Sequence, residues 1–180
     1  NGSSAAMSSI VGKPGLVTKV YIPRQILVLS SVLSGFVSSL LEFLVLICLL
    51  VAFGVPISFT VLLFPFIHLL FLFLLCGLSL GLASLYVYYR DLNQIWEVLL
   101  QAGFFLCPIV YPLSTIPEQY LPLYMLNPIT DLITIYRDIF LYGQLPSPAT
   151  IAIVVISGVL LFSVGKLLFD KLERRFAEAV

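Results

Sequence analysis

The sequence predicts an all-α integral membrane protein with four membrane-spanning helices. Of its 180 residues, 61% are hydrophobic and 10% are charged, with a mean hydropathy of +1.12. A soluble domain carries about 25% charged residues, so most of this surface must face lipid. The apolar residues gather in four long stretches, and the basic residues between them are unevenly distributed. These observations favour a multi-pass topology, and the zero net charge gives no reason to expect a nucleic-acid partner.

The four apolar stretches are the predicted spans. A helix needs about 20 residues to cross a hydrocarbon core of about 30 Å. The stretches cover 26–53, 57–87, 93–111 and 149–169. The first two exceed the required length, so we expect them to tilt, bend or extend beyond the membrane. Pro65 is the expected kink point of the second span.

The basic residues predict the orientation. If the chain crosses four times, eight of them fall on one side: Lys13, Lys19, Arg24, Arg90, Lys166, Lys171, Arg174 and Arg175. The opposite side, made of 54–56 and 112–148, contains only Arg137. Loops rich in Lys and Arg stay in the cytoplasm. The segment 1–25 and the tail 170–180 are therefore predicted to be cytoplasmic.

The segment 114–146 is predicted to form helices at the outer side. It is too polar to cross the membrane and too apolar for an ordinary loop. The run from Thr115 to Glu118 has the spacing of a capping box, which predicts a short helix. Asn127-Pro128 is a typical helix start and Gly143 a typical helix end.

Within 128–142 the residues separate onto two helical faces, which predicts an amphipathic helix at the outer leaflet. The expected apolar face consists of Ile129, Leu132, Ile133, Tyr136, Ile139 and Phe140. The expected polar face consists of Thr130, Asp131, Thr134, Arg137 and Asp138.

Two predicted spans carry polar residues four positions apart, which places them on one helix face. The first set is Ser34, Ser38 and Glu42, and the second is Glu97 and Gln101. Small residues at this spacing let helices approach closely. A carboxylate at the bilayer centre costs about 2.5–3.5 kcal/mol, so it should face protein or water. Both a pathway lining and a tight helix contact fit these polar seams.

The sequence contains no recognisable active site. His68 lies in a run of Leu and Phe without a carboxylate or cysteine at catalytic spacing, which favours a structural role over a proton relay. The three cysteines are far apart in apolar runs and are predicted to be buried free thiols. Phosphate-binding loops, nucleophile elbows and metal-ligand sets are absent from the sequence. The pair Gly77 and Gly81 is typical of helix packing.

Tyrosines gather on the predicted outer side, where Tyr111, Tyr120 and Tyr124 lie close in sequence. Aromatic residues form belts at membrane interfaces. Aromatic rings also stack on sugars, so these side chains fit either an interfacial belt or the lining of a glycan path.

Several motifs resemble those of ABC-2 type export permeases. The run from Gly15 to Arg24 is similar to their cytoplasmic coupling segment, and Tyr89-Arg90-Asp91-Leu92 to the turn before their fifth span. The proline-rich run from Pro108 to Gly143 is similar to their outer re-entrant region. The similarity extends from about residue 10 to the end of the chain. It is greatest to permeases for lipid-linked polysaccharide, O-antigen, capsule or teichoic-acid chains. Ile22 and Gln25 depart from the pattern, which usually has Phe and Glu there.

The resemblance implies roles for particular residues. ATPase-coupling residues would be Gly15, Lys19, Tyr21, Pro23, Arg24, Tyr89, Arg90 and Asp91. Outer-gate residues would be Pro108, Pro112, Pro117, Glu118, Asn127, Pro128, Arg137 and Gly143.

The resemblance also implies the wider system. The family has six spans, so this chain is expected to contain spans three to six of a longer protein. A homodimer of the permease would pair with a separate ABC ATPase subunit and move a glycan outward across the cell inner membrane. This chain has no Walker motif, so ATP and Mg would be bound by the partner, and the chain itself is expected to be neither an enzyme nor a cofactor protein. An exporter of a small drug or lipid is one alternative. A membrane-embedded glycan transferase is another, with Glu42 and His68 as its sole acid/base pair.

Overall fold

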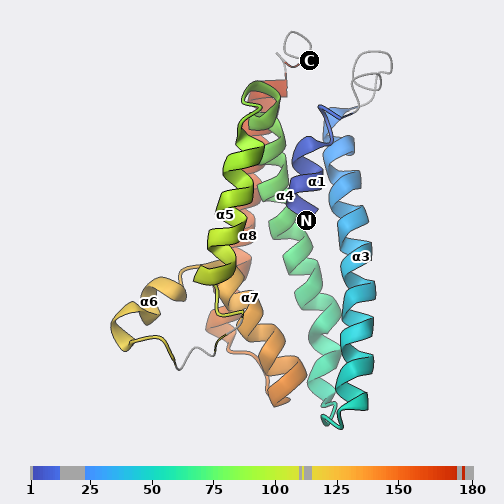
Figure 1. Ribbon diagram of the computed structural model, residues 1–180, viewed down its shortest axis with the longest axis vertical. Helices are drawn as coiled ribbons and strands as arrows, with labels where there is room; N and C mark the ends of the chain where they lie inside the picture. The colour runs from blue at the N-terminus through green and yellow to red at the C-terminus, as the bar shows by residue number, and fades with distance from the viewer. Residues whose placement is uncertain (1, 13–22, 110, 112–114, 174–175, 177–180) are drawn as a thin grey trace.

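The structure is a computed structural model that describes residues 2–12, 23–109, 111, 115–173 and 176. Every element in these residues is a helix. Three long helices run along the longest axis of the molecule: α3 (Arg24–Ala52), α4 (Phe64–Tyr88) and α8 (Pro148–Glu173) (Figure 1). Helix α4 packs against both α3 and α8. The hydropathies of these three segments are 2.5, 2.6 and 2.4, so each is long and apolar enough to cross a membrane.

The third predicted span is shorter than expected. Helix α5 (Leu92–Leu106) has 15 residues, a rise of about 22 Å against a hydrocarbon core of about 30 Å. It ends early because Cys107, which precedes Pro108, adopts an extended backbone with ψ 144°, and proline disfavours the helical conformation of the residue before it. Three of the four predicted spans are therefore helices of spanning length in the described residues, and the count of four is not confirmed.

The second span begins with a change of helix type. A 3-10 helix, η1 (Phe59–Leu63), leads directly into α4. Pro65 lies in the first turn of α4, where its missing N–H leaves no hydrogen bond unmade. The expected irregularity near Pro65 is therefore a junction between two helix types.

The outer segment consists of short helices: η3 (Glu118–Tyr120), α6 (Leu121–Tyr124), α7 (Pro128–Arg137) and the π-helix η4 (Asp138–Tyr142). As predicted, the Asn127 side chain caps α7 by accepting from the Ile129 N–H at 3.1 Å. Gly143 ends η4 in the left-handed conformation with φ +61°. The expected capping box is wrong, because Ile116 and Pro117, which would be the first residues of its helix, are not helical, and η3 begins only at Glu118.

The two faces of α7 differ from the prediction. Thr130 and Asp131, assigned to the polar face, have no exposed surface, whereas Ile129 of the expected apolar face is 46% exposed. Helix α7 contacts both α4 and α8. It therefore buries a wider surface than the single stripe of a helix lying on a membrane surface.

The first described residues lie within the bundle. Helix α1 (Gly2–Ser8) packs against α3 and α4 (Figure 1). Ala6, Met7 and Ile10 are fully buried, and Trp96 Nε1 donates to Ser3 Oγ at 3.1 Å. The sequence placed these residues in the cytoplasmic segment 1–25, but their small and apolar side chains pack between helices.

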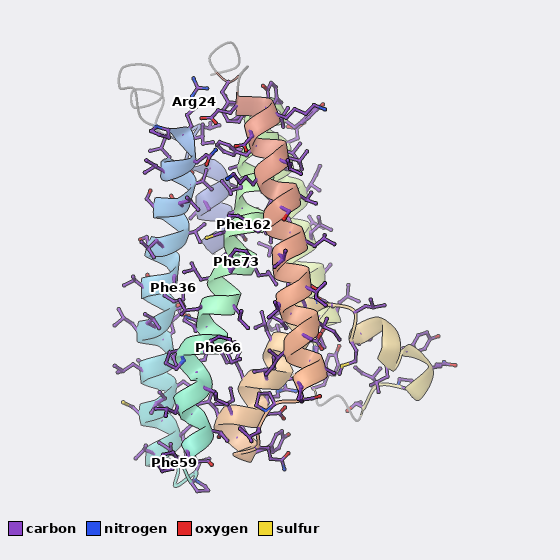
Figure 2. The ribbon with its side chains drawn as sticks, turned by 180° about the vertical axis from the view of Figure 1, so that it is seen from behind. Arg24, Phe36, Phe59, Phe66, Phe73 and Phe162 are labelled. Carbon is purple, nitrogen blue, oxygen red and sulfur yellow. The ribbon has the colours of Figure 1, made fainter. Side chains whose placement is uncertain are left out.

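Helices α4 and α8 meet backbone to backbone. A Cβ atom on Gly77 would overlap the backbone of Phe162, and a Cβ on Gly165 would overlap the Gly77 carbonyl. Phe73 and Phe162 stack beside this contact with ring centroids 4.7 Å apart (Figure 2). The predicted packing role of the Gly77–Gly81 pair is thus confirmed.

Candidate functional site

The two ends of the bundle carry different groups of predicted site residues. Arg24 and Phe59 mark the opposite ends (Figure 2). We call the end that holds Arg24, Tyr88 and Glu173 the inner end, and the end that holds Phe59 and η4 the outer end, after the predicted orientation.

At the inner end, the start of α3 is fastened to the end of α8. Arg24 Nη1 donates to the Glu173 carbonyl at 2.7 Å, and its guanidinium lies 5.7 Å from the Phe176 ring centroid. The Tyr88 hydroxyl donates to the Leu172 carbonyl at 3.0 Å. These donors satisfy carbonyls that the last turn of a helix leaves unpaired, and the cation lies where the helix dipole is negative.

The predicted coupling residues divide into three groups. Gly15, Lys19 and Tyr21 lie outside the described residues. Pro23 is exposed directly before α3, and the Arg24 side chain is engaged within the chain. Tyr89, Arg90 and Asp91 form an exposed turn between α4 and α5, which leaves their side chains available to another protein.

At the outer end, α7 is tied to the segment that follows α5. Arg137 donates to the carbonyls of Ile109 at 3.0 Å and Tyr111 at 3.4 Å. Asn127 Nδ2 lies 3.4 Å from Cys107 Sγ, next to the buried Pro108. Three predicted gate positions are therefore brought together.

The other predicted gate residues are dispersed. Pro117 is exposed, Pro128 occupies the first turn of α7, and Gly143 lies against Ser58 of the α3–α4 connection. Pro112 and the side chain of Glu118 lie outside the described residues.

The three outer tyrosines surround one cavity. Its volume is about 450 Å³, and its lining is Tyr111, Thr115, Ile116, Pro117, Tyr120 and Tyr124. The hydroxyls of Tyr111 and Tyr124 lie 3.4 Å apart. Three tyrosine side chains thus line one concave surface, which an interfacial belt alone does not require.

The predicted polar seams face away from the described helices. Ser34, Ser38 and Glu42 are exposed on α3, and Glu97 and Gln101 are exposed on α5. Their side-chain hydrogen bonds stay within the same helix, such as Ser38 Oγ to the Ser34 carbonyl at 3.1 Å and Asn93 Nδ2 to Glu97 Oε1 at 3.0 Å. The seams therefore are not helix contacts within the described part of the chain.

Sequence reasoning missed the burial of Asp131. Among the described residues, both of its carboxylate oxygens and Thr130 Oγ1 lack a hydrogen-bond partner. Burial raises the pKa of Asp131 to about 6. The helical period puts both residues on the polar face of α7, and only the folded structure shows that they are buried.

His68 is also enclosed, and both of its ring nitrogens have partners. Nε2 lies 2.9 Å from Ser39 Oγ on α3, and Nδ1 lies 2.9 Å from the Tyr136 hydroxyl on α7. Glu42, which paired with His68 in the transferase alternative, is exposed. The surroundings of His68 fit the structural role that the sequence favoured.

Comparison with known proteins shows the family to which this chain belongs. The ABC-2 type transporter family matches residues 7–141. The chain is 34% identical over 176 residues to an O-antigen export system permease protein RfbA of Myxococcus xanthus, covering 96% of this chain and 67% of that protein. It is 27% identical over 179 residues to an RfbA protein of Klebsiella pneumoniae, covering 99% of this chain and 69% of that protein. With three apolar helices of spanning length and a family match over most of its length, the chain is a membrane protein of the ABC-2 type transporter family.

Proposed function

We propose that this chain is the permease of an ATP-driven exporter that moves a lipid-linked polysaccharide, such as O-antigen, outward across the cell inner membrane. The observation that carries the proposal is the similarity to O-antigen export permeases over 96–99% of the chain. The aligned region includes the turns at the inner end as well as the helices at the outer end. The similarity therefore covers both ends of the proposed pathway.

The outer cavity supports a glycan as cargo. A volume of about 450 Å³ with three tyrosines in its lining suits a sugar ring, which offers apolar faces to aromatic rings and hydroxyls to polar groups. In this proposal Tyr111, Tyr120 and Tyr124 contact successive sugars as the polymer leaves.

The inner end supports coupling to a separate ATPase subunit, which would bind ATP and Mg. The exposed turn Tyr89–Asp91 and the segment 13–24 would form the contact. A push on that segment reaches Arg24, which is bonded to the end of α8. Helix α8 is locked to α4 and begins beside the outer segment. Switching between two packing arrangements would carry the push outward.

The exposed polar seams support an assembly of two copies. Glu42 on an apolar helix needs protein or water around it, and the described chain leaves it exposed. In a homodimer, the seams of α3 and α5 would line the conduit or the contact between copies.

The test is a deletion of the gene in its native host, followed by glycan measurement on intact and on lysed cells. The proposal expects surface glycan to disappear while lipid-linked glycan accumulates inside, and expects the wild-type gene to restore export. Tyr120→Ala should restore less surface glycan than wild type at equal membrane abundance. The matched control is Tyr142→Ala, which makes the same change at an exposed residue outside the cavity.

Three other outcomes of the deletion would overturn the proposal. Unchanged surface glycan together with greater sensitivity to a small toxic compound would indicate a drug exporter. Surface glycan of altered composition and normal amount would indicate a transferase. Unchanged glycan with altered membrane lipid distribution would indicate a lipid exporter.

A further inference from the structure

The imidazole of His68 joins three helices at the outer end. It lies on α4 with 1% of its surface exposed. Ser39 of α3 is bonded to one ring nitrogen and Tyr136 of α7 to the other, each at 2.9 Å. A single side chain therefore links the outer helix α7 to two long helices.

The protons of this network have one consistent arrangement. The Ser39 hydroxyl donates to the Phe36 carbonyl at 2.7 Å. A serine hydroxyl has one proton, so Ser39 Oγ acts as an acceptor toward His68, and Nε2 must carry hydrogen. Nδ1 of the neutral ring is then an acceptor, and the Tyr136 hydroxyl donates to it. The chain of donors runs from Tyr136 through His68 and Ser39 to the Phe36 carbonyl.

Other protonation states of His68 do not fit. Hydrogen on Nδ1 would face the Tyr136 hydroxyl, whose own proton would then have no partner among the described residues. If Nε2 carried no hydrogen, its lone pair would face the lone pairs of Ser39 Oγ and no hydrogen bond would form between them. Such a bond would require Ser39 to give up its bond to the Phe36 carbonyl. The geometry therefore selects the neutral ring with hydrogen on Nε2.

Aromatic rings of α3, α4 and η4 surround the network. Ring centroids of Phe36, Phe64 and Phe43 lie 4.6, 5.0 and 5.1 Å from that of His68. Phe140 of η4 packs on Phe43 and Phe64 at 5.7 and 5.5 Å. Because His68 is buried among these rings, breaking one of its hydrogen bonds leaves a buried polar group unsatisfied.

We propose that His68 is a positioning residue of the permease: its Nε2–H ring holds the outer helix α7 in register with α3 and α4, and export depends on that register. The dependence of export rests on the proposed function, whereas the tautomer and the register do not. Two further bonds bring η4 to the same place, because Thr60 Oγ1 donates to the Ile139 carbonyl at 3.0 Å and Ser58 Oγ to the Gly143 carbonyl at 3.4 Å. Those two bonds fix the end of the segment, and His68 fixes its middle.

The tautomer is measured by ¹⁵N NMR on the chain in lipid nanodiscs, labelled at histidine and purified with a tag that lacks histidine. His68 is the one histidine of this sequence, and the His68→Gln spectrum assigns its signals. The expected signals are those of a protonated Nε2 and an unprotonated Nδ1. Tyr136→Phe removes the donor to Nδ1 and should produce a second form in exchange. Protonation of Nδ1 in the wild type would overturn the proposal.

The register is measured by the reactivity of Cys107, which is buried and lies next to Asn127 before α7. The background is Cys48→Ser with Cys76→Ser, which leaves one thiol. Tyr136→Phe should raise the rate of maleimide labelling about fivefold, the factor for one net hydrogen bond. Tyr142→Phe, at an exposed residue nearby, should leave the rate unchanged.

A double-mutant cycle separates positioning from packing. Ser39→Ala and Tyr136→Phe remove groups bonded to opposite nitrogens of His68, so their effects on labelling should be non-additive if the ring connects them. Additive effects would overturn the proposal. Surface glycan should fall severalfold in Tyr136→Phe at unchanged membrane abundance, and unchanged export in that variant would overturn the role in transport. If deletion of the gene leaves surface glycan intact, the proposed function fails, and the tautomer and labelling results still decide the register.

Discussion

Replacing Gly77 by alanine tests whether α4 and α8 form one rigid unit. The added methyl group would overlap the backbone of Phe162 on α8. Backbone atoms cannot rotate away as the end of a flexible side chain can, so the two helices must separate. Separation also weakens the neighbouring close approach of Gly165 to the Gly77 carbonyl. The same argument applies to Gly165→Ala from the other helix.

Gly77→Ala should lower the free energy of unfolding by about 1–3 kcal/mol, the usual cost of adding one carbon to a closely packed interior. Two other glycines provide matched controls. At Gly81 the new carbon would be 3.6 Å from the Gly165 Cα, an ordinary contact, so Gly81→Ala should cost little. At Gly103 of α5 no atom lies within 4 Å, so Gly103→Ala should be neutral or slightly stabilising, because alanine favours helix by about 1 kcal/mol over glycine.

The assay is thermal unfolding of the detergent-solubilised chain, followed by intrinsic fluorescence and by loss of monodisperse protein. The expected order of melting temperature places Gly77→Ala and Gly165→Ala well below wild type, with Gly81→Ala and Gly103→Ala close to it. Equal melting temperatures for Gly77→Ala and Gly103→Ala would refute backbone contact between α4 and α8.

Three further predictions concern the ends of the bundle. Burial raises the pKa of Asp131 to about 6 from an ordinary value of 3.8, so the folded chain holds this proton more tightly than the unfolded chain. The contribution of this bound proton to the free energy of unfolding is complete below about pH 4 and is lost as the pH rises through 6. The melting temperature, measured from pH 4.5 to 7.5, should therefore depend less on pH in Asp131→Asn than in wild type. Asp91→Asn, at an exposed turn, should show the pH dependence of wild type. Arg137→Gln should speed proteolysis of the segment after α5, because its two carbonyl contacts are lost; an unchanged cleavage rate would show that the contacts are unimportant. Arg24→Gln should reduce export more than membrane abundance by loosening α3 from α8, whereas a parallel fall of both would indicate a folding role.

The long helices, the N-cap of α7 and the end of η4 were predictable because local signals determine them. Runs of apolar residues set the positions of α3, α4 and α8, and Asn127 and Gly143 act on their own backbone neighbours. The length of α5 could also have been predicted from local sequence, because the helix ends just before Pro108. The prediction was too long because the apolar run continues to residue 111. Hydropathy therefore overestimated the length of this one helix.

The contacts of the outer end were not predictable, because they depend on residues far apart in the sequence. Ser39, His68 and Tyr136 are separated by 29 and 68 positions. In the sequence, Ser39 looks like one more small residue beside the polar seam of α3, and Tyr136 looks like part of an apolar face. Asp131 illustrates the same limit, because the helical period of α7 cannot show that its polar face is buried in the folded chain.

The way each helix is attached implies how motion would divide within the chain. Helices α4 and α8 touch through glycine backbones, an arrangement that tolerates neither sliding nor separation without overlap or loss of contact. Helix α7 packs on α4 and α8 through buried apolar side chains such as Leu132 and Ile135, and it is also held by discrete polar bonds at His68 and Arg137. Discrete bonds can be broken and remade in a second arrangement while the helix itself stays intact. We therefore infer that a displacement at Arg24 moves α4 and α8 together as one body.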